Sequence, residues 1–451
     1  MNILIRDDYM AISDCTNVEK ITIKDFFTEK DLSNAITKRG FDKTKIKKVC
    51  FVLNKKGVLI LRSGYLQDLI YLLKKENIEA TVKDNRTKFD FQKKEYSYDD
   101  IRKNLGDFKY VEHQVNAVKK MLKTNVGVIK QPTSAGKSST MSCYLKISKL
   151  PTLIVVSGVS LANQIMKSLN DDGVDCGICT GKGKIHGECM VSTIGSVKKI
   201  TDLDRYKCVI VDELHEAAAK QYQDFLSSVN YPIRFGFSAT PEGNSPFRWM
   251  KIRQFFGNII FETFAEELLV NKVITPPEIV FKKTNGVPTL DWQSALEKNI
   301  INNKERNKII SNLANTLEGS TLILYRIIEH GEELQKLIKN SILLHGEHSL
   351  EERDQAIKDF KEGKVKTIIA SNIFKQGISI NEINNLIVAG GGKSKIETLQ
   401  KLGRVLRKAK GKDVAYVYDF HDEGNRFTEE HSLQRANLYK KAGYTNIIYE
   451  D

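Results

Sequence analysis

The sequence lacks any long apolar run. No stretch reaches the roughly 18 to 20 residues that a membrane-spanning helix requires, and the N-terminus has no hydrophobic segment of the kind found in signal peptides. Cysteine is scattered, with seven residues over 451 positions, so its spacing indicates no disulfide framework. These absences argue against a membrane protein and against a secreted, disulfide-rich one. We expect a protein of the reducing cytoplasm, the host cytoplasm if the chain is viral.

Basic residues are in excess, with 70 Lys and Arg against 56 Asp and Glu, which gives a net charge of +14. This charge, with a pI near 9.2, favours a polyanionic partner, most simply nucleic acid. A generally lysine-rich proteome would give the same excess, so charge alone leaves both interpretations open. The length is enough for roughly three domains.

Residues 1–95 contain no nucleotide-binding motif, and their periodicity predicts a small α+β domain. The expected helices are Leu32–Thr37 and Tyr65–Lys75, and the expected strands are Lys48–Leu53, Gly57–Leu61 and Ile78–Val82. Nine basic residues and one acid lie between Lys38 and Arg62. This segment is either a surface that grips duplex DNA by its phosphates or a solvated hairpin, and we favour DNA binding.

The polar segment Lys83 to Asp107 places a domain boundary near residue 95. Beyond it, short apolar strands alternate with helical segments, which is typical of parallel sheets covered by helices on both faces. The first strands are Val126–Lys130, Thr152–Ser157, Cys189–Thr193, Cys208–Asp212 and Arg234–Ser238. A second series is Thr321–Tyr325, Ile342–His345, Thr367–Ala370, Leu386–Ala389 and Val414–Tyr418. The predicted class is α/β, with the small domain at 1–95 followed by two parallel-sheet domains at 96–265 and 266–451.

The segment Val126 to Ser138, VGVIKQPTSAGKS, joins a strand to a helix-forming stretch through a Gly-Lys-Ser turn. This is the arrangement of a phosphate-binding loop. Backbone N–H groups around Gly136 would surround the phosphates, Lys137 would reach the β- and γ-phosphates, and the Ser138 hydroxyl would hold Mg²⁺. Gln131 stands where the usual loop has Gly, and a lone Gly-Lys-Ser also occurs by chance. The assignment therefore depends on partners downstream.

Two adjacent carboxylates end the strand Cys208–Asp212, at the edge where parallel sheets bind ligands. Asp212 would bind Mg²⁺, directly or through water, and Glu213 would orient and deprotonate the water that attacks the γ-phosphate. His215 would be a polar link. A chance acidic pair is the alternative, but the combination with Lys137 favours a nucleotide site.

The segment Gln400 to Arg407, QKLGRVLR, carries two arginines three positions apart. On a helix, Arg404 and Arg407 would share one face. Two guanidinium groups so placed could both reach a phosphate and offset the charge of the transferred phosphoryl group. The alternative is a solvated basic helix.

Taken in order, these segments resemble the motifs of superfamily 2 helicases. Gln131–Ser138 is similar to motif I, Asp212–His215 to the DExH form of motif II, Ser238–Thr240 to motif III and Gln400–Arg407 to motif VI. The resemblance covers roughly residues 105 to 420 and implies two tandem RecA-like domains that use ATP and Mg²⁺. The implied ATP-binding residues are Gln114, Pro132, Thr133, Ser134, Ala135, Gly136, Lys137, Ser138 and Gly377. The implied catalytic residues are Lys137, Asp212, Glu213, Gln400, Arg404 and Arg407, with Ser138 and Asp212 as Mg²⁺ ligands.

A narrower resemblance is to the phage UvsW-type recombination helicases. It depends on Pro132–Ser138, Gly377–Ser379 and the segment from Lys393 to Lys408. It implies a DNA-dependent ATPase that unwinds forks, branch-migrates Holliday junctions and acts at single-strand/duplex junctions in recombination, repair or replication restart. It also favours a monomer with 3′→5′ polarity. Ser379 stands where many superfamily 2 members have Asp, so we give it no metal or ribose role.

Other functions stay open at this point. The motifs do not separate a DNA helicase from an RNA helicase or from a duplex translocase that does not unwind. A non-catalytic nucleic-acid clamp is disfavoured by the intact Lys137, Glu213 and Arg407. A motor subunit of a restriction complex would need a nuclease from another subunit.

One cysteine cluster has the residue types of a zinc site: Cys176, Cys179, His186 and Cys189. The first two lie on a predicted strand, where positions three apart face opposite sides. We therefore expect buried thiols rather than a bound metal.

Overall fold

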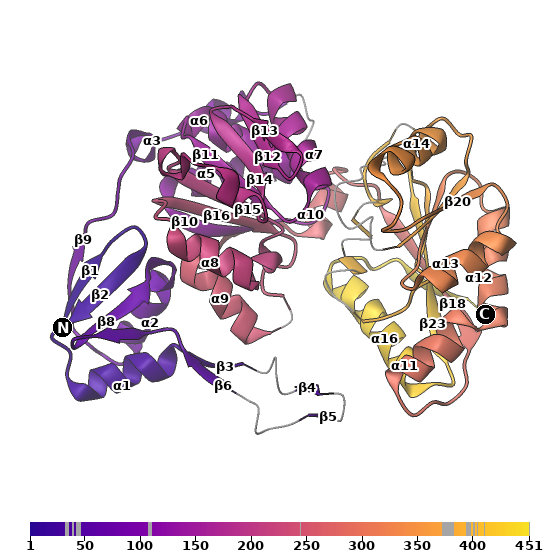
Figure 1. Cartoon of the computed structure of the whole chain (residues 1–451), viewed down its shortest axis with the longest axis horizontal. Helices are drawn as coiled ribbons and strands as arrows, with labels where there is room; N and C mark the ends of the chain where they lie inside the picture. Colours follow the sequence, from indigo (N-terminus) through magenta and orange to yellow (C-terminus); the bar gives the residue numbers. More distant parts are fainter. Residues whose placement is uncertain are drawn as a thin grey trace. The chain divides into compact units, whose positions relative to one another are not determined.

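The structure is a computed structural model. It describes residues 1–31, 36–37, 40–41, 47–106, 111–243, 245–371, 383–393, 398–399, 402–403, 405–409 and 411–450. These residues form two compact units (Figure 1). Unit 1 contains Met1–Gln131 and Gly136–Glu262, and unit 2 contains Pro132–Ala135 and Thr263–Asp451.

The N-terminal part of unit 1 is a five-stranded sheet with helices packed on one face. Its strand order is β7(Leu53–Lys55), β8(Val58–Arg62), β2(Tyr9–Ser13), β1(Asn2–Ile5) and β9(Thr81–Asp84). Alternate residues of β2 and β8 are buried with residues of α1(Asn17–Phe26) and α2(Leu66–Lys75) in one apolar cluster. The small α+β architecture agrees with the sequence prediction, although β1 and β2 were not predicted.

Two details of this part differ from the prediction. The segment predicted as one strand at Lys48–Leu53 is divided between β6(Lys47–Cys50), which pairs with β3(Thr28–Asp31), and β7, which pairs with β8. The β7–β8 hairpin turns at Lys56 and Gly57, which both have positive φ, as a tight hairpin requires. The predicted helix Leu32–Thr37 is wrong at its end, because Ile36–Thr37 is strand β4, paired with β5(Gly40–Phe41). Residues 32–35 lie outside the described residues.

An eight-stranded sheet forms the rest of unit 1. Its order is β13(Gly183–Ile185), β12(Cys176–Thr180), β14(Cys189–Thr193), β11(Thr152–Val156), β15(Cys208–Asp212), β16(Ile233–Ser238), β10(Val126–Lys130) and β17(Ile259–Glu262). Neighbouring strands are parallel except the β12–β13 pair. The observed bounds of β10, β11, β14, β15 and β16 differ from those of the five predicted strands by at most one residue.

Both faces of this sheet are covered (Figure 1). Ile154 and Ile210 pack with α5(Glu112–Lys123), α6(Lys137–Ser148) and α7(Val159–Asp171), whereas Val155 and Val211 pack with α8(Lys220–Ser228) and α9(Pro246–Phe256). Adjacent residues of a strand thus lie in different apolar layers. This explains why the strands are continuous apolar runs rather than alternating ones.

The N-terminal part is fixed to α9 and β16 by polar contacts. Arg234 donates from Nη2 to Ser63 Oγ at 2.6 Å, and the Tyr65 hydroxyl donates to the Met250 carbonyl at 2.8 Å. Gly64 lies so close to the backbone of Arg253 that any side chain at position 64 would collide with it. The two parts of unit 1 therefore form one packed body.

Unit 2 contains a seven-stranded parallel sheet. Its order is β20(Ser341–Leu344), β21(Thr367–Ala370), β19(Thr321–Leu324), β22(Asn385–Ile387), β23(Ala415–Glu423), β18(Pro277–Asn285) and β24(Ile447–Glu450). One face packs on α12(Lys304–Thr316) and α13(Ile328–Leu337), and the other on α14(Leu350–Lys361) and α16(Arg426–Lys441). The α/β class with two tandem parallel-sheet domains, typical of RecA-like folds, is confirmed. Strands β18 and β24 were not predicted.

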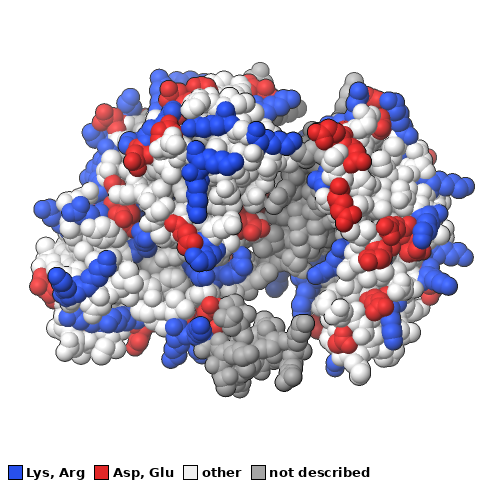
Figure 2. Space-filling model, viewed as in Figure 1, with Lys and Arg blue, Asp and Glu red and all other residues white. Residues whose placement is uncertain are grey.

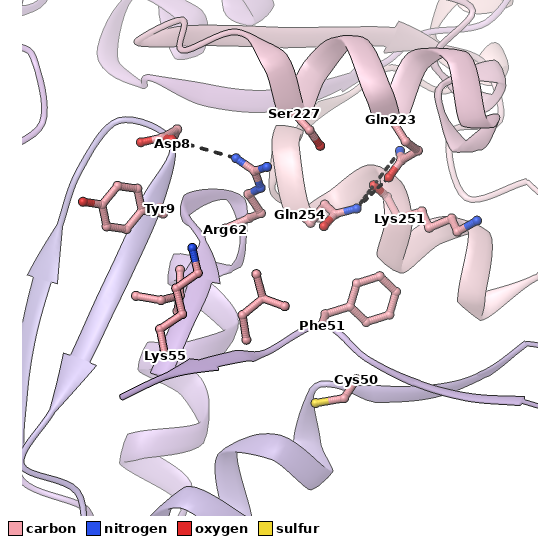
Figure 3. Close-up of a pocket in the computed structure, with 12 residues that line it drawn as sticks. Asp8, Tyr9, Cys50, Phe51, Lys55, Arg62, Gln223, Ser227, Lys251 and Gln254 are labelled. Carbon is pink, nitrogen blue, oxygen red and sulfur yellow. Dashed lines mark hydrogen bonds and ion pairs between the residues drawn. The ribbon is translucent and has the colours of Figure 1, made fainter. Parts of the chain in front are cut away.

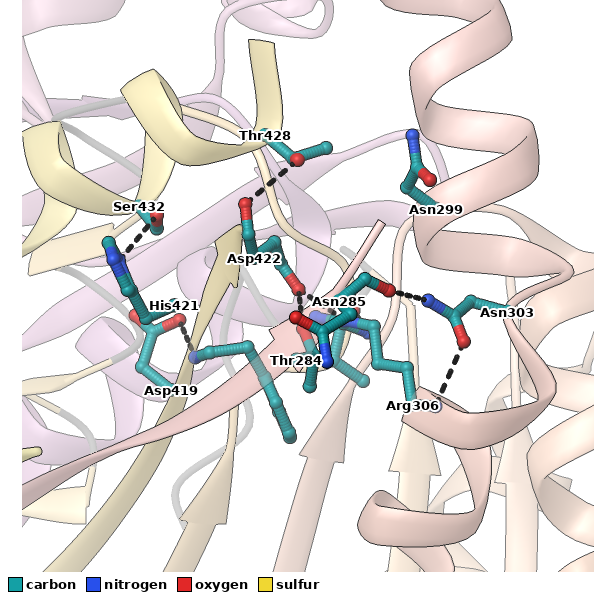
Figure 4. A network of polar contacts seen from close by, with 12 residues as sticks. Thr284, Asn285, Asn299, Asn303, Arg306, Asp419, His421, Asp422, Thr428 and Ser432 are labelled. Atoms are coloured by element: carbon teal, nitrogen blue, oxygen red, sulfur yellow. Dashed lines mark hydrogen bonds and ion pairs between the residues drawn. The ribbon is translucent and has the colours of Figure 1, made fainter. Parts of the chain in front are cut away.

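A buried ion pair ties three strands of unit 2 together (Figure 4). Asp422 on β23 accepts hydrogen bonds from Arg306 Nε at 2.8 Å and from Thr284 Oγ1 at 2.7 Å. Arg306 also donates from Nη1 to the carbonyl of Ala389, just after β22, at 2.8 Å. Both charged groups are shielded from water, so each depends on the other for its charge compensation.

A second buried ion pair involves Asp419, which lies on the same strand as Asp422. Arg435 on α16 binds Asp419 through Nε and Nη2, and the Tyr439 hydroxyl donates to the same carboxylate at 3.0 Å. Arg435 Nη1 donates to the carbonyl of Gly392 at 2.8 Å. Together the two pairs hold both ends of the turn that follows β22.

The excess positive charge is not gathered into one patch on the face of the molecule that Figure 2 shows, where Lys and Arg are interspersed with Asp and Glu. Within the described residues, no helix is both long and apolar enough to cross a membrane.

Candidate active site

The phosphate-loop sequence starts a helix, as predicted. Gly136 has φ of +81° and serves as the N-cap of α6, whose first two residues are Lys137 and Ser138. A helix N-terminus presents unpaired N–H groups and favours anions. Gln114 on α5 is buried, and its Nε2 donates to the Gly136 carbonyl at 3.2 Å. The positive φ at position 136 favours glycine, and a Cβ there would displace the Gln114 amide from its present position.

The predicted lysine and carboxylates of unit 1 lie together at one edge of the sheet. Lys137 Nζ is 3.4 Å from Glu213 Oε1 and 4.0 Å from Asp212 Oδ1. Glu213 follows β15 with φ of +51°, a left-handed conformation that is unusual for a residue other than glycine. Such strain is often found at functional sites, where surrounding structure maintains it.

Asp212 is a suitable ligand for a divalent cation. Its side chain is 7% exposed, and Oδ1 has no hydrogen-bond donor among the described residues. Burial raises the pKa of Asp212 to about 6, with Glu213 acting in the same direction and Lys137 opposing it. A hard cation beside this oxygen would favour the ionised carboxylate, so the donor set fits Mg²⁺.

A chain of polar contacts connects Glu213 to the end of β16. His215 Nδ1 lies 3.5 Å from Glu213 Oε2 and 3.2 Å from Ser238 Oγ. The Thr240 backbone N–H donates to Ser238 Oγ at 3.1 Å. The predicted role of His215 as a polar link therefore has a geometric basis. The sequence Ser238–Thr240, a weak signal by itself, lies in the same cluster.

Gly236 on β16 allows the segment after Glu213 to pack closely against the sheet. A side chain at Gly236 would collide with Leu214, the residue between Glu213 and His215. The absence of a Cβ lets the short helix η5(Leu214–Ala218) pack directly on β16. The carboxylates and Ser238 thereby lie on neighbouring strand ends.

Sequence reasoning missed two features beside the loop. The amide of Gln131 is fully buried, and neither its oxygen nor its nitrogen has a partner among the described residues. Lys130, the last residue of β10, lies 3.0 Å from Glu242 and 2.9 Å from Glu262. Burial disfavours the charge of Lys130, but hydrogen bonds to Glu262 and Glu242 outweigh it and raise the pKa. Glu242 is 112 residues away, so no local pattern could have indicated the contact.

The remaining loop residues, Pro132, Thr133, Ser134 and Ala135, group with unit 2 by their contacts. Ser134 has φ of +72°, and the Ala135 N–H donates to the Pro132 carbonyl at 3.3 Å, so the loop is a tight turn.

Of the predicted site residues in the C-terminal half, the structure describes Arg407. Its carbonyl accepts hydrogen bonds from Lys412 Nζ at 3.3 Å and Thr275 Oγ1 at 3.5 Å, and the Thr275 N–H donates to the Leu406 carbonyl at 2.8 Å. These contacts, all within unit 2, fix the backbone that carries Arg407. Gly377, Gln400 and Arg404 lie outside the described residues.

The cysteine cluster is divided between the two sides of the sheet. Cys176 and Cys189 pack in the layer of α5 to α7, whereas Cys179 packs in the layer of α8 and α9. Burial raises the pKa of the Cys176 thiol to about 12 and of the Cys189 thiol to about 11, which favours the neutral form. The opposite orientation of Cys176 and Cys179 follows the strand periodicity.

Two family models match the chain in the order of its two parallel sheets. Residues 107–243 match the family described as "Type III restriction enzyme, res subunit", and residues 296–409 match "Helicase conserved C-terminal domain". The chain is a superfamily 2 helicase. The resemblance inferred from the ordered motifs is confirmed, and this helicase is an ATP-hydrolysing enzyme of the helicase and translocase family.

This helicase is similar to named relatives over most of its length. It is 28% identical over 372 residues to the ATP-dependent DNA helicase uvsW of Enterobacteria phage T4, covering 74% of this chain and 72% of that protein. It is 23% identical over 349 residues to the DNA 3′-5′ translocase XPB2 of Sulfurisphaera tokodaii, covering 66% and 78%. A solved structure of the ATP-dependent Type ISP restriction-modification enzyme LlaBIII bound to DNA matches its fold with a TM-score of 0.60 at 15% identity, covering 84% of this chain and 34% of that one.

Proposed function

We propose that this helicase is a DNA motor that unwinds forked DNA and branch-migrates Holliday and single-strand/duplex junctions, powered by ATP and Mg²⁺. The observation that carries the proposal is the position of Lys137 at the start of α6, with its Nζ 3.4 Å from Glu213 and 4.0 Å from Asp212 at the end of β15. A cation, an acid suited to Mg²⁺ and a second carboxylate at a helix N-terminus are the groups that ATP hydrolysis requires.

Each group has a role that its position allows. Lys137 binds the β- and γ-phosphates, which would draw its ammonium away from Glu213. Glu213 then accepts a proton from the attacking water as general base. Ser138 and Asp212 would hold Mg²⁺, which would supply positive charge to neutralise the phosphates. Gln114 and the loop Pro132–Gly136 surround the adenine side and the phosphates.

The C-terminal half supplies the remaining groups in this proposal. Arg404 and Arg407 stabilise the charge of the transferred phosphoryl group, and Gln400 and Gly377 support the same site. We also propose the division 1–95, 96–265 and 266–451, a monomeric state and action in the cytoplasm. The basic segment from Lys38 to Arg62 contacts DNA through its phosphates.

The test is ATP hydrolysis by the full chain with and without a synthetic four-way junction, measured alongside separation of a forked duplex. The proposal expects junction-stimulated hydrolysis, fork unwinding and movement of the branch point. Stimulation by RNA in place of DNA would favour an RNA helicase, and absence of turnover under all conditions would favour a non-catalytic clamp.

A second candidate is a duplex translocase that does not separate strands. The name of the XPB2 relative, a DNA 3′-5′ translocase, supports this alternative. Displacement of a third strand from a triplex reports translocation without unwinding. Triplex displacement with no strand separation on forked or branched DNA would favour the translocase.

A further inference from the structure

A groove in unit 1 lies between the N-terminal sheet and the helices α8 and α9 (Figure 3). Its volume is about 650 Å³, within the usual range for ligand sites. Strands β2, β7 and β8 supply one wall, and Gln223, Ser227, Lys251 and Gln254 supply the other. The site is separate from the Lys137 cluster, and two of its lining residues, Lys55 and Arg62, belong to the basic segment from Lys38 to Arg62.

The sheet wall presents the face that α1 and α2 do not cover. Met10, Ile12, Leu59 and Leu61 point into the helix-covered core, so their strand neighbours point the other way. Tyr9 pairs with Arg62 across β2 and β8, and Leu53 pairs with Ile60 across β7 and β8. The wall thus combines an aromatic ring, two aliphatic side chains and a cation.

The charges around the groove are mostly positive. Lys55, Arg62 and Lys251 line it, and the one lining acid, Asp8, lies 3.8 Å from Arg62. Phe51 adds a second aromatic ring between the two walls (Figure 3). On the opposite wall two side-chain amides are hydrogen-bonded to each other: Gln254 Nε2 donates to Gln223 Oε1 at 2.6 Å.

We propose that this groove binds one unpaired strand of DNA, with bases against Tyr9 and Phe51 and phosphates at Lys55, Arg62 and Lys251. Aromatic rings accept any base by stacking, and cations on the rim follow the backbone. A duplex would offer its phosphates alone, because its bases are already stacked and paired, and the apolar wall would gain no partner. The proposal rests on the proposed DNA function and adds a second strand contact to it.

Cys50 allows a direct test in the unmodified chain. It is an exposed thiol that lines the groove, whereas Cys15 is half-buried and the other five cysteines are buried. Labelling of Cys50 by a maleimide should slow at least about fivefold when a saturating oligothymidylate is bound, because thiol reactions depend on access. A blunt duplex of equal length should leave the rate within about twofold of the free protein.

Substitutions on opposite walls test the charges. Lys55→Gln with Lys251→Gln should reduce the magnitude of the salt slope for oligothymidylate binding by about 1.4, since each phosphate contact on a single strand contributes about 0.7. The matched control, Lys119→Gln with Lys167→Gln, removes the same charge from exposed positions on α5 and α7 that do not line the groove. It should leave the slope closer to that of the unmodified chain.

Tyr9 tests the stacking. Tyr9→Ala should weaken binding of the single strand about fivefold or more, whereas Tyr9→Phe keeps the ring and should bind within about twofold. Equal labelling of Cys50 with and without the single strand would overturn the proposal. Equal protection by duplex, with no effect of Tyr9→Ala, would overturn it in favour of a duplex-backbone site. All these measurements are made without ATP, so failure of the hydrolysis proposal leaves their outcome unchanged.

Discussion

His215 Nδ1 lies 3.2 Å from the hydroxyl oxygen of Ser238, and this contact joins the end of β15 to the end of β16. The same imidazole nitrogen is 3.5 Å from Glu213, and Ser238 in turn accepts the Thr240 N–H. A change at the γ-phosphate that moves Glu213 therefore has a direct route to the segment that follows β16.

The first prediction concerns this contact. His215→Ala should lower the number of base pairs separated per ATP hydrolysed, because the route from Glu213 to Ser238 is broken. Ser238→Ala should do the same. In a double-mutant cycle, the free energies of unfolding of the two single variants and the double variant should depart from additivity by about 0.5–3 kcal/mol, as expected for residues in contact. The control is His186→Ala, an exposed histidine of the same unit. Additive effects of His215→Ala and Ser238→Ala would contradict a shared role.

The second prediction concerns the ion pairs of Lys130. Lys130→Met should lower the melting temperature, because Glu242 and Glu262 then lose a half-buried cation between them. The free energy of unfolding should fall by about 1 kcal/mol. Lys119→Met, at an exposed position on α5, is the matched control. Equal melting temperatures for both variants would show that the three charges contribute no net stability.

The third prediction concerns the pair of Arg435 and Asp419. Arg435→Met should destabilise the protein by about 3–5 kcal/mol in urea denaturation, because it leaves a buried carboxylate without its cation. Arg435→Met combined with Asp419→Leu should recover most of the loss, since an apolar pair needs no charge compensation. If the double variant is less stable than the single one, the contacts to Gly392 and Tyr439 outweigh the ion pair.

The fourth prediction concerns pH. Burial, with a smaller effect of Arg306, lowers the pKa of His330 to about 3 from an ordinary value near 6.5. The unfolded chain therefore binds a proton below about pH 6.5 while the folded chain does not, so stability falls as the pH drops from 6.5 towards 3. His330 contributes a slope of up to about 1.4 kcal/mol per pH unit in this window.

His330→Gln should flatten that part of the pH profile while keeping a polar group for Asn307, which lies 3.0 Å from Nε2. The exposed His186→Gln is the control and should leave the profile unchanged. An unaltered slope in His330→Gln would assign the acid sensitivity to other groups, such as His431, whose pKa burial lowers to about 4.

The parallel sheets were predicted well because their strands are short apolar runs covered on both faces. Cys189–Thr193, Cys208–Asp212 and Thr367–Ala370 have the predicted bounds. The N-terminal strands were harder, because Asn2–Ile5 and Tyr9–Ser13 are short and half-exposed and their pairing is set by distant partners. Pairing of β6 with β3 instead of β8 is likewise a non-local choice.

The candidate site likewise contains some residues that the sequence predicted and some contacts that it did not. Lys137, Asp212 and Glu213 could be named from the sequence because each stands at a strand end or helix start with a recognisable pattern. The contacts of Lys130 with Glu242 and Glu262, and the buried amide of Gln131, depend on which strands become neighbours. That order is a property of the folded sheet.

The central claim is that Glu213 and Lys137 carry out ATP hydrolysis, and steady-state hydrolysis in the presence of a four-way DNA junction tests it most directly. Glu213→Gln should lower the rate about a hundredfold or more, and Lys137→Ala should lower it by a similar factor, while both variants still bind the junction. Glu188→Gln and Lys119→Ala, at exposed positions of unit 1, should hydrolyse ATP like the unmodified chain. Full junction-stimulated hydrolysis by both Glu213→Gln and Lys137→Ala would contradict the account.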